Sequence, residues 1–356
     1  MEYLNKTRNN FLDFSRGITV FLMILGHCIQ NGNGKFFLER QLFWNDYFFK
    51  FIYSFHMSLF ALISGYFLNL STNRYNIKEG ILRKIKYLLF PIVVFGVYRY
   101  FLYSYFILKD RNTFNLKDFI LSILQGYWFL WGILYLSIIV FIIKYLFFDN
   151  IIVYFTLFFV LLLVPNEIHN IKLSTILFLY PFILIGYFFS KYQEVILKVI
   201  KENKKFILLI LLLFFFLQFL FFNKESYIYI YIYISGLNIT KTKLKTSVIH
   251  QIFIDLFRIN IGLTGSCFVL LILDEISKSN KLKKIYNIFI YLGQNSLSFY
   301  CLQELLIVYL LVPFTINYQK NYKINFLQAI IVIILCYFID KILKRYTILK
   351  KIHFGI

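Results

Sequence analysis

Two histidines stand inside apolar stretches of the chain, where an ionisable side chain is costly to place. Residues 18–29 are apolar apart from Thr19 and His27, and His56 lies within the run FIYSFHMSLFALISGYF (51–67). Ionisable groups inside a membrane are functional candidates by default. Both histidines are therefore candidates for a functional site, and both rings could face one polar cavity. An interhelical hydrogen bond is the structural alternative for His27.

Two charged residues precede the first histidine on the same apolar stretch. Arg16 comes eleven residues before His27, which corresponds to about 16 Å of rise along a helix. Arg16 and His27 would therefore share a helix face without touching each other. Asp13 comes three residues before Arg16, so these two side chains can meet on one face. A cytoplasmic salt bridge that anchors the helix end is the alternative interpretation of this pair.

A basic run, RKIKYLLFP (83–91), lies at the start of the third apolar stretch. Arg83, Lys84 and Lys86 can reflect membrane topology and attraction to anionic membrane lipid. They can equally form a charge clamp for the phosphates of a cytosolic cofactor. We expect Pro91 to kink the helix that follows.

Further polar residues occur at positions where apolar neighbours dominate. Asp255 and Arg258 are three residues apart and can pair along one helix face. Glu304 follows Gln303 within the run NSLSFYCLQELLIVYLL. Trp128 lies in GYWFLWGILYL, where an aromatic belt at the membrane surface would place it. Each of these residues is a candidate for lining a polar cavity, and each has a structural alternative.

The composition of the chain determines the solvent that its helices must face. The hydrophobic fraction is 60%, the mean hydropathy is +0.70 and only 15% of the residues are charged. Soluble domains contain about a quarter charged residues. Helices satisfy every backbone polar group within one segment, whereas a β-barrel would need alternating strands of about ten residues. Continuous apolar runs therefore predict an all-α fold, a polytopic integral membrane helical bundle.

We expect about ten transmembrane helices in a single domain, residues 1–356. No internal repeat or soluble domain is evident. The predicted segments are 12–30, 47–69, 86–108, 119–147, 150–164, 174–190, 206–222, 248–273, 288–313 and 324–343.

The net charge of +21 follows the topology and does not indicate a nucleic-acid partner. Most of the 38 lysines and arginines lie in one alternating set of short segments between the apolar runs. The positive-inside rule assigns that set, and both termini, to the cytoplasm. The four cysteines stand apart in apolar runs with no metal-ligand spacing, so we expect buried apolar thiols and no metal.

Two further stretches are interpreted without a function. The start of the chain lacks an A-x-A-like cleavage site, so we expect a retained first helix instead of a signal peptide. The run 227–234 alternates tyrosine and isoleucine, which is typical of a β-strand, although a helix extension remains an alternative.

These motifs resemble those of the membrane acyltransferase 3 family, the O-acetyltransferases of bacterial surface polysaccharides, and most closely its fucose 4-O-acetylase-like branch. LDFSRGITVFLMILGHC is similar to the family's opening block. FIYSFHMSLFALISGYF resembles its second block, with Ser58 in place of a proline. The basic run into Pro91, WFLW (128–131), RINIGLTGS (258–266) and GQNSLSFYCLQ (293–303) are each similar to later blocks. Gln303 stands where the family often has a histidine.

The resemblance implies transfer of an acetyl group from cytosolic acetyl-CoA, the acyl-CoA donor, to a hydroxyl of a cell-surface glycan or lipid-linked sugar acceptor. The enzyme would lie in the bacterial cytoplasmic (inner) membrane, with His27 as general base or as a transient acetyl carrier. The implied site residues are His27, Arg16, His56 and Asp13 for catalysis, Arg83, Lys84 and Lys86 for acetyl-CoA, and Trp128, Arg258, Gln303 and Glu304 for the acceptor.

Two other functions remain open on the sequence. A transporter or flippase for a lipid-linked glycan would also place polar residues within its spans, and it would show inverted repeats or discontinuous helices. A non-catalytic membrane partner of a polysaccharide synthase would not depend on His27 for its function. Arg16, His27 and His56 each have a role only in the acyltransferase hypothesis.

Overall fold

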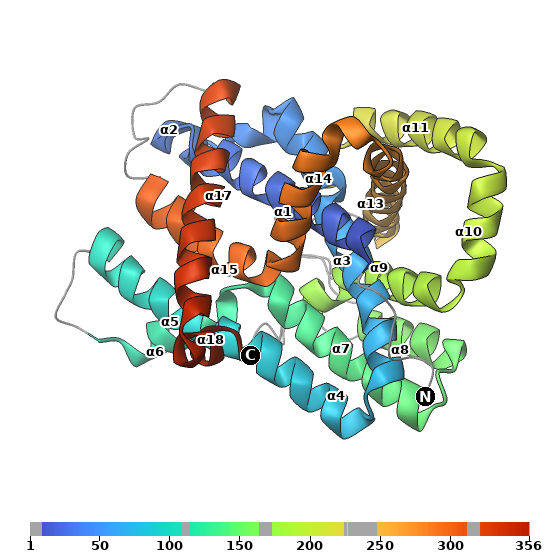
Figure 1. The fold of residues 1–356 in the computed structure, drawn as a ribbon, viewed down its shortest axis with the longest axis horizontal. Helices are drawn as coiled ribbons and strands as arrows, with labels where there is room; N and C mark the ends of the chain where they lie inside the picture. Colours follow the sequence, from blue (N-terminus) through green and yellow to red (C-terminus); the bar gives the residue numbers. More distant parts are fainter. Residues whose placement is uncertain are drawn as a thin grey trace.

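The computed structural model describes residues 9–108, 114–163, 173–223, 226, 248–311 and 321–355 of the chain. Every regular element within these ranges is a helix, which confirms the all-α prediction (Figure 1). The tyrosine–isoleucine run 227–234, which we interpreted as a strand or a helix extension, lies outside the described residues.

Helix α1 (Asn10–Asn31) is the element around which the site is built. Its N-terminus is capped by Asn9, whose side-chain oxygen accepts a hydrogen bond from the backbone of Leu12. It packs against α3 (Tyr47–Arg74), α14 (Lys283–Gln294) and α17 (Tyr322–Arg345). Figure 1 shows this group of helices crossing near the centre of the molecule.

Glycines permit the closest of these crossings. A Cβ atom on Gly17 of α1 would overlap the backbone oxygen of Phe289 in α14, and one on Gly293 of α14 would overlap the backbone oxygen of Asp13. Small residues let two backbones approach closely where apolar burial gives no driving force. The pair fixes α1 against α14 and so positions the side chains along α1.

A second glycine pair joins α3 to α9 (Leu173–Lys191). Gly65 lies against the backbone of Ile183, and Gly186 lies against the backbone of Leu62. This crossing fixes the helix that contains His56 against the interior of the bundle.

The remaining helices complete the fold around these central elements. They are α2 (Lys35–Glu39), η1 (Leu42–Asn45), α4 (Ile77–Lys84), η2 (Ile85–Leu89), α5 (Phe90–Tyr103), η3 (Ser104–Leu108), α6 (Leu116–Gln125), α7 (Trp128–Leu146), α8 (Ile151–Leu163), α10 (Gln193–Glu202), α11 (Lys204–Phe221), α13 (Val248–Ser277), η4 (Asn280–Leu282), α15 (Ser296–Leu306), η5 (Ile307–Leu311) and α18 (Thr347–Phe354).

Six helices of the described residues are long and apolar enough to cross a membrane: α1, α3, α7, α11, α13 and α17. Helices α9 and α10 meet at a bend of 89°. If this bent pair is counted as one span, the number of candidate spans rises to seven. The polytopic helical bundle is therefore confirmed. Each of the ten apolar segments coincides with helical structure, but ten membrane crossings remain a prediction.

The structure divides two of the predicted segments. Segment 119–147 becomes α6 and α7, because Tyr127 adopts a left-handed backbone conformation (φ 49°) between them. Segment 288–313 breaks at Asn295, between α14 and α15. The break at Tyr127 lies beside the site described below.

Pro91 does lie at an irregularity in its helix. The π-helical turn η2 precedes it, and Pro91 is in the first turn of α5. A proline has no N–H to donate and so removes one backbone hydrogen bond from the helix. The change to a π-helical hydrogen-bonding pattern before Pro91 accommodates this loss.

Candidate active site

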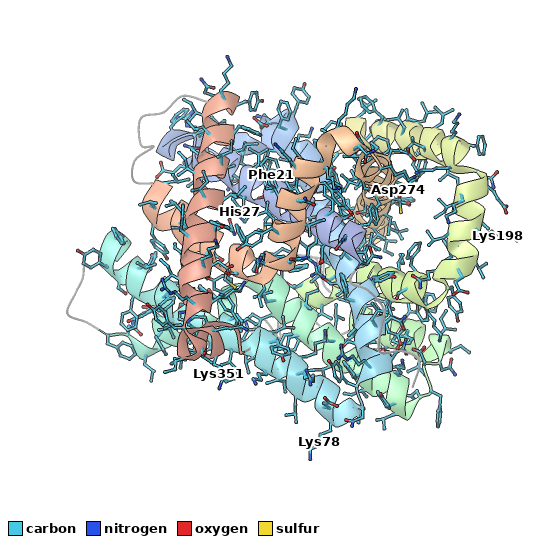
Figure 2. All side chains as sticks on the ribbon, in the orientation of Figure 1. Phe21, His27, Lys78, Lys198, Asp274 and Lys351 are labelled. Atoms are coloured by element: carbon cyan, nitrogen blue, oxygen red, sulfur yellow. The ribbon has the colours of Figure 1, made fainter. Side chains whose placement is uncertain are left out.

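A polar cavity of about 210 Å³ surrounds His27 within the helix bundle. It lies between α1, α3, α5, α6, α7, α15 and η5, so segments far apart in the sequence build one site. Figure 2 shows His27 among the helices, whereas Lys78, Lys198 and Lys351 lie at the edge of the view. The lining residues are Met23, His27, Gln30, Asn31, Met57, Arg99, Gln125, Tyr127, Trp128, Tyr300, Gln303, Glu304, Ile307 and Val308.

Gln303 orients the imidazole of His27. The side-chain oxygen of Gln303 lies 2.8 Å from Nδ1 of His27, and the Gln303 amide nitrogen donates to the backbone oxygen of Tyr300 at 3.3 Å. Because the amide N–H is directed to Tyr300, its oxygen accepts from Nδ1–H of His27. Nε2 of His27 is then left with its lone pair available to take a proton.

Two opposite charges lie in the same cavity. Nε of Arg99 is 3.5 Å from Oε1 of Glu304, and both side chains remain about a third exposed. The backbone oxygen of Arg99 accepts a hydrogen bond from the Tyr309 hydroxyl at 3.1 Å. Sequence reasoning assigned Glu304 to this site but missed Arg99. A charged residue inside an apolar run was the signal that could have found it.

Trp128 also lines this cavity, at the start of α7. The left-handed residue Tyr127 precedes it, and the Tyr127 hydroxyl donates to the backbone oxygen of Cys301 at 3.3 Å. This contact fixes the break between α6 and α7 against α15. Trp128 therefore contributes an aromatic surface to the cavity beside polar groups, an arrangement that suits one apolar face of a sugar ring.

His56 lies next to this cavity and does not line it. Its ring is buried, and Nδ1–H donates to the backbone oxygen of Ile52 at 2.9 Å. The ring of Tyr53 packs edge-on against His56, with centroids 4.5 Å apart, and lies 6.4 Å from the ring of His27. The structure thus brings His27 and His56 close together, with Tyr53 in contact with both rings.

A second cavity, also of about 210 Å³, surrounds Arg16 at the opposite end of α1. It contains three cationic side chains and no carboxylate among its described lining residues. The lining residues are Arg16, Ser64, Phe67, Leu68, Ser71, Tyr75, Arg83, Lys84, Tyr87, Leu88, Ile133, Ser137 and Ile183.

Neighbouring side chains fix two of these cations. The guanidinium of Arg16 lies 4.4 Å from the ring centre of Phe67. That of Arg83 lies 4.3 Å from the ring centre of Tyr75, and its Nε is 3.0 Å from Oε1 of Glu79. Ring stacking and the ion pair with Glu79 hold these planar guanidinium groups in place, and a guanidinium suits contact with an anion.

The third cation, Lys84, has a perturbed acidity. Burial, together with the nearby charge of Arg16, lowers the pKa of Lys84 to about 8. An anion in this cavity would restore the preference of Lys84 for its charged form. Lys86 does not line the cavity, and its backbone oxygen lies against Gly355 near the chain's C-terminal end.

The remaining predicted site residues lie away from both cavities. Asp13 is buried where α1 crosses α14, beside Gly293. Arg258 is buried in α13 and pairs with Asp255, with 2.8 Å between Nη1 and Oδ1. The guanidinium of Arg258 also lies 5.7 Å from the ring centre of Phe178. The predicted pairing along one helix face is confirmed for Asp255 and Arg258, and Arg258 is not among the residues that line the His27 cavity.

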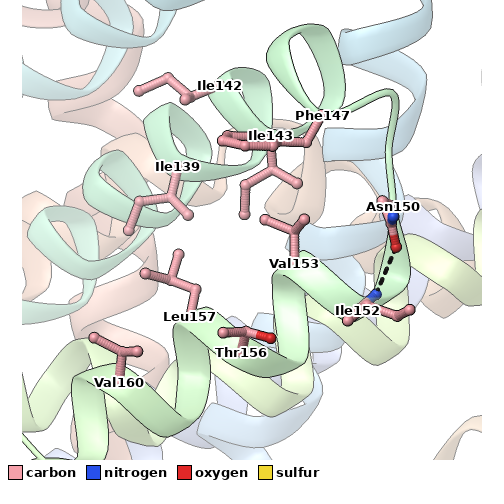
Figure 3. Close-up of a pocket in the computed structure, with 10 residues that line it drawn as sticks. All are labelled: Ile139, Ile142, Ile143, Phe147, Asn150, Ile152, Val153, Thr156, Leu157 and Val160. Carbon is pink, nitrogen blue, oxygen red and sulfur yellow. Dashed lines mark hydrogen bonds between the residues drawn. The ribbon is translucent and has the colours of Figure 1, made fainter.

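A third and larger cavity, about 470 Å³, lies between α7 and α8. Its lining is almost entirely aliphatic, as Figure 3 shows, and contains no titratable side chain among the described residues. In this cavity the Asn150 side-chain oxygen accepts a hydrogen bond from the backbone N–H of Ile152 at 2.9 Å (Figure 3). This cavity offers no group for acid–base chemistry.

Comparison with known proteins agrees with the motifs. The model of the acyltransferase 3 family, described as an acyltransferase domain, matches residues 9–339. The chain belongs to the acyltransferase 3 family. The matched range includes α1, α3, α5, α6, α7, α15 and η5, and therefore every helix that contributes a described lining residue to the His27 cavity.

Two curated relatives are both called nodulation protein NolL. The protein from Mesorhizobium japonicum is 32% identical over 126 residues, which covers 35% of this chain and 33% of the relative. The protein from Sinorhizobium fredii is 31% identical over 128 residues, which covers 36% of this chain and 34% of the relative. The match therefore spans about a third of the length of these relatives. No solved structure matches the chain.

Proposed function

We propose that the protein is a membrane O-acyltransferase, which moves an acetyl group from cytosolic acetyl-CoA to a hydroxyl of a cell-surface or lipid-linked glycan. One observation carries this proposal. A cationic cavity at Arg16 and a polar cavity at His27 lie along the same helix, eleven residues apart. A donor rich in phosphate and an acceptor rich in hydroxyl groups fit these two cavities respectively. Family membership supports the same reaction class.

The donor fits the cationic cavity through its phosphates. Arg16, Arg83 and Lys84 supply three positive side chains, two of which are guanidinium groups suited to bidentate contact with phosphate. The positive-inside rule assigns this end of α1 to the cytoplasm, where acetyl-CoA is found. Membrane lipid would contact the apolar outer surface of the bundle.

The acceptor fits the His27 cavity. Trp128 offers a ring on which a sugar can stack, and Arg99, Glu304 and Gln303 offer donors and acceptors for hydroxyl groups. The charges of Arg99 and Glu304 compensate each other, which favours an uncharged sugar.

The chemistry follows from the orientation of His27. Nε2 takes the proton of the acceptor hydroxyl while the hydroxyl oxygen attacks the thioester carbonyl carbon. A carbon–oxygen bond forms and the carbon–sulfur bond breaks. The imidazolium then returns its proton to the departing thiolate, so that the products are the acetyl ester and free CoA. Gln303 accepts from Nδ1–H throughout, which keeps the ring oriented.

Transfer of label from radioactive acetyl-CoA to membrane glycan tests the proposal. We expect wild-type membranes to transfer label. At equal protein abundance, membranes with His27→Ala should transfer it at a rate at least about a hundredfold lower. His353→Ala is the matched control, because His353 is buried between α18 and α5 and contacts Tyr98, outside both cavities. Equal rates for wild type and His27→Ala would overturn the role of His27. Absence of label with all three proteins would favour a transporter or a non-catalytic partner.

A further inference from the structure

The two cavities are separate in this structure. Among the described residues none lines both of them, although the proposed reaction requires the acetyl group of a donor bound at Arg16 to reach His27. Helix rise places these two residues about 16 Å apart. Some part of the bundle between them must therefore let the donor's acyl arm pass.

One face of α1 connects the cavities. Arg16, Val20, Met23 and His27 follow one another at spacings of four, three and four residues, which is the spacing of a single helix face. Arg16 lines the cationic cavity, and Met23 and His27 line the polar cavity. Val20, between them, is fully buried.

Helix α3 also lines both cavities with one face, in the opposite order along the chain. Met57 lines the polar cavity, and Ser64 and Leu68 line the cationic cavity. Ala61 lies between them at the same helix-face spacing and is fully buried. The two helices pack against each other, so the two faces form one seam that runs from cavity to cavity.

The side chains that close this seam are small or flexible. Val20, Met23, Met57 and Ala61 belong to one buried cluster, and none of them is charged or polar. Methionine is unbranched and adapts its shape easily, and alanine occupies the least space of any side chain with a Cβ. Phe60, beside Ala61, is engaged elsewhere, with its ring centre 5.0 Å from that of Phe129.

We infer that the seam between α1 and α3, closed here by Val20, Met23, Met57 and Ala61, is the passage along which the donor's acyl arm reaches His27. This inference rests on the proposed acetyl transfer. The methionines move aside when the arm enters, and Ala61 limits the width of the acyl group that can pass. Larger acyl groups are excluded at this position, before they reach the acceptor.

Cysteine accessibility tests the passage without relying on catalysis. The four native cysteines are replaced by alanine, and Ala61→Cys is treated in inverted vesicles with an anionic, membrane-impermeant thiol reagent. Ser64→Cys, which lines the cationic cavity, is the positive control. Ala329→Cys, at a fully buried alanine of α17, is the negative control.

We expect the thiol of Ala61→Cys to react at least about tenfold faster than that of Ala329→Cys, and CoA to protect it. Reaction no faster than at Ala329→Cys, while Ser64→Cys reacts and is protected by CoA, would overturn the passage and leave the donor site intact. If CoA fails to protect Ser64→Cys, the donor site of the proposed function fails instead.

A second comparison covers the case in which the cysteine-free protein does not fold. Ala61→Leu and Ala329→Leu add the same bulk at fully buried positions in the wild-type chain. We expect Ala61→Leu to lower acetyl transfer at least about tenfold with unchanged binding of acetyl-CoA, and Ala329→Leu to keep its transfer rate per folded molecule. Equal transfer by the two variants would contradict the passage.

Discussion

At the scale of single residues, the hydrogen bond between Gln303 and Nδ1 of His27 leaves Nε2 to take the proton in the proposed reaction. A glutamine at this position was interpreted from the sequence as an acceptor-binding residue. The structure pairs its oxygen with Nδ1 of His27 and its nitrogen with the backbone of Tyr300, and Gln303 also lines the cavity. In the proposed reaction Gln303 therefore acts through His27 as a positioning residue.

Replacing Gln303 tests this positioning role. We expect Gln303→Leu to lower kcat at least about tenfold, because the imidazole loses the acceptor that selects its tautomer. KM for acetyl-CoA should stay unchanged, since Gln303 is absent from the cationic cavity. Gln303→Glu retains an accepting oxygen and should recover most of the lost kcat. Steady-state kinetics of both variants distinguish this role from donor binding, which would alter KM.

If Lys84 binds the donor as proposed, donor binding should depend on pH. Because its pKa is lowered to about 8, the charge is present below about pH 8 and is lost as the pH rises through that value. We expect KM for acetyl-CoA to rise between about pH 7 and pH 9 in the wild type, since one phosphate-binding charge disappears. Lys84→Arg keeps its charge over this range and should show a flatter profile. A wild-type slope preserved in Lys84→Arg would contradict the assignment of this lysine.

At the scale of helices, the crossing of α1 with α14 positions both cavities. Gly17 and Gly293 bring the two backbones into contact, and the polar and cationic residues of α1 extend from that crossing. We expect Gly293→Ala to cost about 1 to 3 kcal/mol of stability, because the added methyl group overlaps the backbone of Asp13. Thermal unfolding in detergent measures this loss.

Gly186→Ala is the matched comparison for that loss, because it adds a methyl group at the equally close crossing of α9 with α3. Both variants should unfold at a lower temperature than the wild type. An unchanged melting temperature for Gly293→Ala would show that α1 and α14 do not approach as closely as described here.

The sequence predicted the helices better than it predicted their breaks and contacts. The bounds of α1 and the start of α3 follow from their apolar runs and from the caps Asn9 and Asp46. The break at Tyr127 was missed because nothing in its residue type signals a left-handed backbone. Arg99 was missed as a site residue, since its pairing with Glu304 joins α5 to a helix some two hundred residues later. Such distant contacts are not encoded in local spacing.

At the scale of the whole molecule, the orientation in the membrane determines which cavity lies on the cytoplasmic side and which lies on the outer side. The positive-inside rule assigns both termini and the cationic cavity to the cytoplasm. We expect a phosphatase reporter to be inactive when fused after the last residue and active when inserted after Gly34, beyond the other end of α1. A fluorescent protein, which matures in the cytoplasm, should give the opposite pattern. Phosphatase activity at the C-terminal fusion would reverse the assignment of donor and acceptor sides.

The most direct test of the account uses sealed vesicles of known orientation. Radioactive acetyl-CoA is added outside inverted vesicles and outside right-side-out vesicles, each with wild-type protein or with His27→Ala. We expect labelled glycan only in inverted vesicles with the wild-type protein, because only these expose Arg16, Arg83 and Lys84 to the donor and retain the base. Equal labelling in right-side-out vesicles, or labelling that survives His27→Ala, would contradict acetyl transfer from the cytoplasm through His27.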